Sequence, residues 1–262
     1  MIRLLRAEAL KMRTVWSSWV LIALAGLVAA LLGTLVGFAP HGRGLQAVLF
    51  PAKGTVGWFD DVFSVMVVSV DFALVLGIIT ITGEYRHKTV TPTFLAVPSR
   101  GMVTASKMIL CLGAGLVIGV WAGAADLALG FACVAGGVGH ASTMLTEFRH
   151  VWPGALFAAV AFGLFGVGLG ALLKNQVMAI VTGLGFIAIV EPIVEAAIPS
   201  VGRFLPGAAA QALESVTAHR TGLGFSTLTH LLTWWEGALV LLAYGLVFAA
   251  VGSLITMRAD VT

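Results

Sequence analysis

The chain has 262 residues, of which 59% are hydrophobic and only 10% are charged, and its mean hydropathy is +1.03. Soluble domains carry about 25% charged residues, so this composition excludes an ordinary soluble protein and predicts an all-α integral membrane protein. The formal net charge of +3 is too small and too dispersed to indicate a nucleic-acid partner.

The first 16 residues are predicted to form an amphipathic helix. Ile2, Leu5 and Met12 share an apolar face, while Arg3 and Arg6 lie on another. Such a helix would lie as an elbow along the inner membrane surface. Two interpretations stay open: a basic anchor for the first membrane span, or an elbow that also contacts a cytoplasmic partner.

Six apolar runs are long enough to cross about 30 Å of hydrocarbon at about 1.5 Å per helical residue. We therefore expect one transmembrane domain over residues 1–262. The predicted spans cover residues 17–38, 62–82, 108–132, 152–173, 177–198 and 236–257.

The distribution of Lys and Arg predicts the orientation, because cytoplasmic loops retain positive charge. With the amino terminus inside, ten of the 15 basic residues fall in inner segments, which puts both termini in the cytoplasm. Tryptophans near the predicted span ends are typical of aromatic belts. The inner basic residues are Arg3, Arg6, Lys11, Arg13, Arg86, Lys88, Arg100, Lys107, Lys174 and Arg258; the belt tryptophans are Trp16, Trp19, Trp58, Trp152, Trp234 and Trp235.

Two loops stand out, one inside over residues 83–106 and one outside over residues 199–235. In the outer loop, Pro206 and Gly207 interrupt the chain, and residues 208–218 have the composition of a short helix.

Glycines recur every fourth residue in the third span, at Gly115, Gly119 and Gly123. This spacing predicts a groove in which another helix packs closely. The partner is either a neighbouring span or a second protomer.

Three acidic residues lie within predicted spans, where an unpaired charge facing lipid is costly. Asp71 lies near mid-membrane, Asp126 follows the glycine groove on the same face, and Glu191 precedes Pro192, which is expected to bend or break the fifth span. The acids either stabilise the bundle or line a substrate path. The aromatic residues expected beside that path are Phe72, Trp121, Phe162 and Phe186.

No catalytic motif is present. The sequence contains no G-x-x-x-x-G-K-[ST] phosphate loop, G-x-S-x-G elbow, H-E-x-x-H pair or C-x-x-C pair. His140, Glu147 and His150 match no standard metal-ligand spacing and are interpreted as solvated loop residues. We therefore expect no enzyme activity, metal or nucleotide site in this chain.

The inner loop carries the most specific motif. The run Glu84-Tyr85-Arg86-x-x-Thr89, followed by Thr93, Leu95, Pro98 and Arg100, resembles the signature of permease subunits in the type 2 family of ATP-binding-cassette exporters. The similarity extends over nearly the whole chain: elbow helix, six spans, a coupling segment after the second span, and a re-entrant outer region between the fifth and sixth. The Glu-Pro of span five and residues 202–206 resemble bacterial, particularly actinobacterial, members. Lys88 is a departure, since glycine is common there.

This resemblance implies a pump in a bacterial cell membrane. Two permease subunits, identical or homologous, would join two separate ATPase subunits, which bind ATP and Mg. A coupling helix over residues 84–92 would dock on the ATPase, and Thr91 before Pro92 independently limits that helix to about two turns. The implied coupling residues are Glu84, Tyr85, Arg86, Lys88, Thr89 and Pro92.

The expected cargo is hydrophobic or amphipathic, such as a drug, an antibiotic or a lipid, because most tryptophans lie near the interfaces and not along a sugar-binding channel. The alternative is a secondary transporter or channel, independent of an ATPase, in which Asp71, Asp126 and Glu191 relay protons.

Overall fold

The computed structural model describes residues 2–38, 51–87, 100–214 and 231–258. Over these residues the chain is helical and contains no strand. The helices of the first half are α1 (Ile2–Thr14), α2 (Trp16–Gly37), α4 (Val56–Ser64), η1 (Val65–Val68), α5 (Ser69–Arg86) and α7 (Arg100–Ala135). Those of the second half are α8 (Ala141–Leu173), α9 (Gln176–Gly185), η2 (Phe186–Val190), α10 (Glu191–Ala197), α11 (Pro199–Gly202), α12 (Pro206–Leu213) and α13 (Trp234–Arg258).

Six helical stretches of the described chain are long and apolar enough to cross a membrane, which confirms the predicted number. Several are longer than predicted. The second runs without interruption through α4, η1 and α5 for 31 residues, about 46 Å at 1.5 Å per residue. This length exceeds the roughly 30 Å of a hydrocarbon core, so part of the helix extends beyond it.

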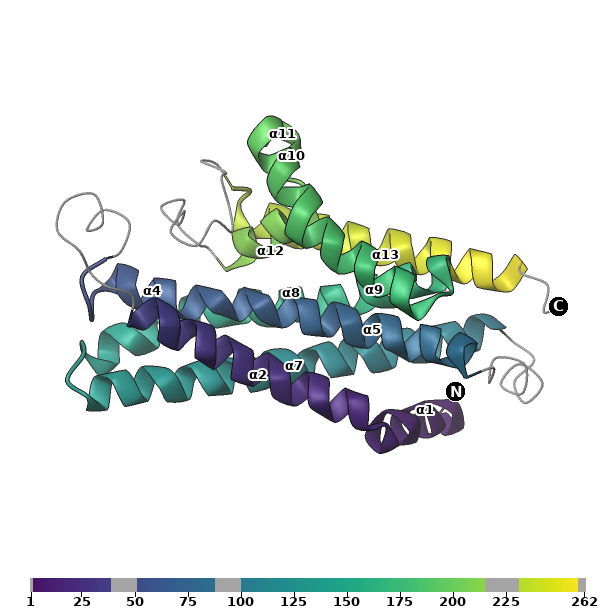
Figure 1. The fold of residues 1–262 in the computed structure, drawn as a ribbon, viewed down its shortest axis with the longest axis horizontal. Coiled ribbons are helices and arrows are strands. Elements are labelled where there is room, and N and C mark those ends of the chain that lie inside the picture. Colours follow the sequence, from purple (N-terminus) through teal and green to yellow (C-terminus); the bar gives the residue numbers. More distant parts are fainter. Residues whose placement is uncertain (1, 39–50, 88–99, 215–230, 259–262) are drawn as a thin grey trace.

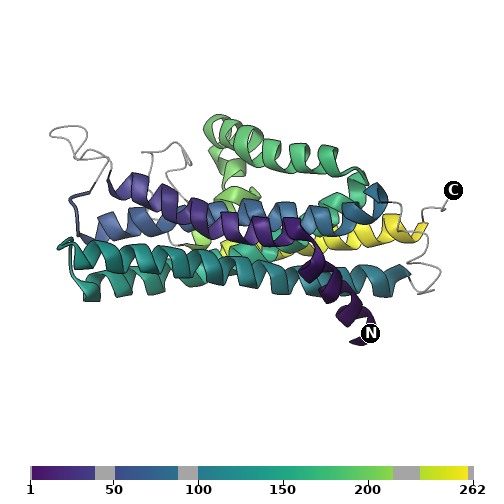
Figure 2. The same cartoon turned by 60° about the horizontal axis from the view of Figure 1, so that its bottom comes forward.

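The helices form an elongated bundle with α5 and α8 at its centre (Figure 1). On one side lie α2 and α7, and on the other α13 and the helical path α9–η2–α10. We call the end where α1 lies, α5 ends and α7 begins the α1 end, and the opposite end the α4 end. Figure 2 shows α1 turning away from the axis of α2. The turn occurs at Val15, the one extended residue between the two helices (φ −84°, ψ 115°).

The central helices α5 and α8 are in close contact because glycines of each helix lie against the backbone of the other. A Cβ on Gly166 would collide with the Leu74 carbonyl of α5, and one on Gly119 would lie 2.7 Å from the Leu156 side chain of α8. Gly115 and Gly123 also face α8. The predicted glycine groove therefore receives a neighbouring span of the same chain, which is the first of the two alternatives.

The tryptophans divide into two groups. Trp16 and Trp234 are well exposed, as membrane-interface residues should be. Trp58, in contrast, is 3% exposed, and the Trp152 ring stacks on Phe148 with centroids 5.6 Å apart. Trp58 is therefore packed inside the protein and Trp152 partly so, which an interface residue need not be: composition near a span end does not show which face of the helix is covered.

The fifth span stays helical across Glu191–Pro192. Proline has no N–H to donate to the carbonyl of Ala188, and here five residues of π-helix, η2, lead into α10. After α10 come α11 and α12, each with a proline in its first turn. The predicted helix over residues 208–218 corresponds to α12, which begins earlier; residues 215–218 lie outside the described chain.

Candidate functional site

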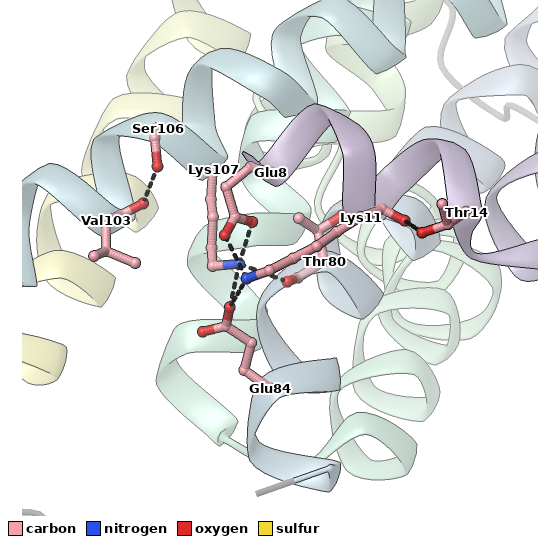
Figure 3. A network of polar contacts seen from close by, with 8 residues as sticks. All are labelled: Glu8, Lys11, Thr14, Thr80, Glu84, Val103, Ser106 and Lys107. Atoms are coloured by element: carbon pink, nitrogen blue, oxygen red, sulfur yellow. Dashed lines mark hydrogen bonds and ion pairs between the residues drawn. The ribbon is translucent and has the colours of Figure 1, made fainter. Parts of the chain in front are cut away.

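Four charged side chains meet at the α1 end, and we call them the charge cluster: Glu8, Lys11, Glu84 and Lys107 (Figure 3). They come from α1, from the last turn of α5 and from the second turn of α7. Lys107 Nζ lies 2.7 Å from Glu8 Oε2 and 2.9 Å from Glu84 Oε1. Lys11 Nζ lies 2.7 Å from Glu8 Oε1 and 3.1 Å from Glu84 Oε1. Each lysine thus contacts both acids, and the four formal charges cancel.

Lys107 and Glu8 are the two most enclosed members. The Lys107 side chain is 3% exposed, as is that of Glu8. Besides the two carboxylates, its ammonium group donates to the backbone carbonyl of Thr80 at 3.3 Å. An ammonium has three N–H donors, so these three oxygens match them in number. A lysine this deeply buried requires such partners.

The electrostatics of α1 agree with this geometry. Burial raises the pKa of Glu8, but attraction and hydrogen bonding from Lys107 and Lys11 outweigh burial and hold it below its ordinary value. Burial likewise lowers the pKa of Lys11, and its contacts with Glu8 and Glu84 more than reverse that shift, so its pKa is raised. Both groups on α1 are therefore held in their charged forms.

The predicted coupling residues are placed as follows. Glu84, Tyr85 and Arg86 form the last turn of α5, so this part of the motif continues the membrane-spanning helix and does not begin a separate one. Glu84 is buried, Tyr85 packs partly against the cluster of Ile81 and Cys111, and the exposed Arg86 donates to Gln176 Oε1 at 3.3 Å. Lys88, Thr89 and Pro92 lie outside the described residues.

A second group contains Asp71, Glu191 and Glu195, which we call the acid cluster. Glu191 is 2% exposed, and its Oε2 accepts from the backbone N–H of Gly207 on α12 at 2.8 Å. Its Oε1 is buried and has no hydrogen-bond partner among the described residues. Glu191 lies within electrostatic range of both other acids. The structure therefore brings the predicted Asp71 and Glu191 near one another.

Asp126 lies elsewhere. It is fully buried, as expected of a residue that faces protein, but its carboxylate lies against Gly33 of α2, whereas Gly123 faces Trp152 of α8. Positions three residues apart on a helix differ by about 300° in direction around its axis, and here this difference makes Gly123 and Asp126 face different helices. Its placement on the glycine face was wrong. Neither carboxylate oxygen has a hydrogen-bond partner among the described residues.

The predicted aromatic residues do not share one location. Phe72 and Phe162 belong to the central core. Trp121 is 49% exposed, and its indole packs over Gly26 of α2, a helix that lies on the opposite side of the bundle from α10 in Figure 1. Trp121 is therefore not beside the acid cluster.

Within the described parts of the chain, no group of three His, Cys, Asp or Glu side chains is arranged to hold a metal ion. Cys111 and Cys133 are both free.

Sequence reasoning did not identify Glu8, Lys11 or Lys107 as site residues. Lys107 precedes the apolar run predicted to start at residue 108, so it was counted as a loop charge; in fact α7 begins at Arg100. The available signal was the pair Glu8 and Lys11, three residues apart on a helix whose other charges are all basic.

Models of known protein families and the sequences of curated proteins were both compared with the chain, and neither comparison found a match.

Proposed function

We propose that this chain is the membrane-spanning subunit of an ATP-driven exporter and works with a separate ATPase. The observation that carries the proposal is the motif Glu84-Tyr85-Arg86 at the end of α5, with Glu84 bound to helices from two other parts of the chain. The α1 end would face the cytoplasm, and the segment after Arg86 would meet the ATPase.

The charge cluster supports this proposal because a force-transmitting end needs fixed geometry. Buried ion pairs contribute little net stability, but they require exact placement of their groups. A loop that only satisfies the positive-inside rule would carry solvated charges instead. Arg86, two residues after Glu84, is exposed and so is accessible to a partner in the way that Glu84 is not.

The other end supports an exporter of the same type. The short helices α11 and α12 lie between two spans, and Gly207 of α12 binds Glu191 within the fifth span. We interpret them as re-entrant helices on the outer side. The path α9–η2–α10 is the least buried of the six spans, which agrees with a second permease protomer, identical or homologous, or lipid against it.

The cargo we propose is hydrophobic or amphipathic. The exposed surface of the fifth span is apolar at Val181, Ile189 and Ile193, and carboxyls lie behind it at Glu191 and Asp71. A cargo with an apolar body and a polar group would match both features.

The test is co-purification with the ATPase encoded in the neighbouring reading frame. A tagged chain should retain that ATPase in detergent and raise or regulate its hydrolysis, while Arg86→Ala with Tyr85→Ala should weaken retention. Purification of the chain alone, with the candidate ATPase expressed in excess, would contradict the proposal.

A second candidate is a secondary transporter, and the acid cluster is the observation in its favour. Carboxyls within electrostatic range of one another inside membrane spans are typical of proton relays. This candidate predicts cargo movement driven by a pH gradient in vesicles that contain the chain and no ATPase.

A further inference from the structure

The helix α1 has few permanent attachments to the bundle. It is joined to α2 through the extended residue Val15, and Met12 packs against the core clusters. Leu10, Val15 and Trp16 are exposed at 62%, 46% and 79%. Two side chains of α1 pair with the bundle: the buried Glu8 with Lys107 of α7 at 2.7 Å, and the half-exposed Lys11 with Glu84 of α5 at 3.1 Å. Loss of the buried pair would leave α1 held by the more exposed Lys11–Glu84 pair, which contributes less.

The same contacts join α5 to α7. Glu84 ends α5 and Lys107 lies near the start of α7, and the segment between these helices carries the rest of the predicted coupling motif. A displacement of Glu84 must therefore either move Lys107 and Glu8 with it or separate charges that are only 2.9 Å and 2.7 Å apart inside protein. Separation leaves buried charges unpaired, which is the costly outcome.

We propose that Lys107 is a positioning residue that makes α1, the end of α5 and the start of α7 move as one unit, so that ATPase-driven movement of the coupling segment reaches α1 and α7 together. This inference rests on the proposed function. It assigns α1 a part in transmission, and it assigns Glu84 to contacts inside the chain, whereas Arg86 is exposed and would face the partner.

The attachment is tested without any ATPase. Spin labels at Ala7 and Met102, both on exposed positions, report the distance between α1 and α7 in a background that lacks Cys111 and Cys133. We expect one narrow distance distribution in the parent protein and a broad one in Lys107→Met. The matched control is Lys174→Met, a lysine at the same end outside the charge cluster.

Reversing every charge in the charge cluster tests whether α1 is held by charge pairing or by the identity of each side chain. Glu8→Lys, Lys11→Glu, Glu84→Lys and Lys107→Glu together keep four pairs of opposite charge, so the distribution should become narrow again. Where Lys107→Met fails to insert, Glu8→Gln removes the same buried ion pair from the α1 side. An unchanged narrow distribution in both single variants would overturn the attachment.

Transmission is tested in the complete complex as cargo transported per ATP hydrolysed. Lys107→Met should lower this ratio about two- to thirtyfold, the range for residues that couple distant sites, while the ATPase still co-purifies; the reversed charge cluster should restore it. If Lys107→Met gives a broad distance distribution but the same amount of cargo transported per ATP, Lys107 does not transmit movement and its contacts are only structural. Failure of the parent chain to bind or need an ATPase would overturn the proposed function and transmission, while the spin-label result would still decide the attachment.

Discussion

Glu84→Gln is the substitution whose effect on the free energy of unfolding follows most closely from the structure. The amide keeps the size of the side chain and one acceptor oxygen but removes a charge, so the balanced charge cluster is left with one positive charge in excess. The pair with Lys107, at 2.9 Å, has side-chain exposures of 3% and 10%. Removal of one partner from a buried pair typically costs about 3 to 5 kcal/mol.

Two further effects change that figure. Loss of the pair with Lys11, in which the lysine side chain is 51% exposed, adds less than about 1 kcal/mol. The amide oxygen still accepts one hydrogen bond, which recovers about 1 kcal/mol. We expect Glu84→Gln to lower the free energy of unfolding by about 2 to 5 kcal/mol.

The assay is equilibrium unfolding in bicelles by a denaturing detergent, followed by the loss of helical circular dichroism. Arg86→Gln is the matched control, because Arg86 is exposed and its hydrogen bond to Gln176 is long, at 3.3 Å; this substitution should lower the free energy of unfolding by less than about 0.5 kcal/mol. Equal stability of Glu84→Gln and the parent protein, or an equal loss in both variants, would refute the reasoning.

Three further predictions concern topology, the acid cluster and pH. In a cysteine-free background, a cysteine at Ser142 should react with an impermeant reagent in intact cells, and one at His87 only after permeabilisation. The reverse pattern would show that the chain has the opposite orientation in the membrane. Glu191→Gln should leave folding intact but change cargo transport or cargo-stimulated hydrolysis, and Asp126→Asn should change them less; no change in either would make both acids structural. Since the pKa of Glu8 is lowered from 4.5, its stabilising contribution is present above pH 4.5 and is lost as the pH falls through the lower folded value. In Glu8→Gln, the free energy of unfolding should fall less steeply as the pH drops below 4.5. The same pH dependence in the variant and the parent protein would show that Glu8 is not paired.

The number of spans was predictable because it depends on composition. A run of about 20 apolar residues has few alternatives to a membrane helix, since every backbone polar group must be satisfied within the segment. The glycine groove of the third span was also predictable, since the spacing of Gly115, Gly119 and Gly123 allows close packing on one face. The choice of α8 as the helix in that groove required the tertiary structure.

The charge cluster was not predictable, because its members lie as much as 99 residues apart in sequence. Nothing local distinguishes Lys107 from a loop lysine until α7 is seen to start at Arg100. The same limit applies to Trp58 and Asp126. Sequence spacing gives the angle of a side chain around its own helix, but which neighbour lies at that angle depends on how the helices pack.

The most direct test of the central claim is transport by the reconstituted complex. Vesicles containing the chain, its ATPase and a fluorescent amphipathic cargo should accumulate the cargo when ATP and Mg are added to the ATPase side, with no pH gradient. Vesicles with the chain alone should not. Equal accumulation driven by a pH gradient in vesicles without the ATPase would contradict an ATP-driven exporter and favour the secondary transporter.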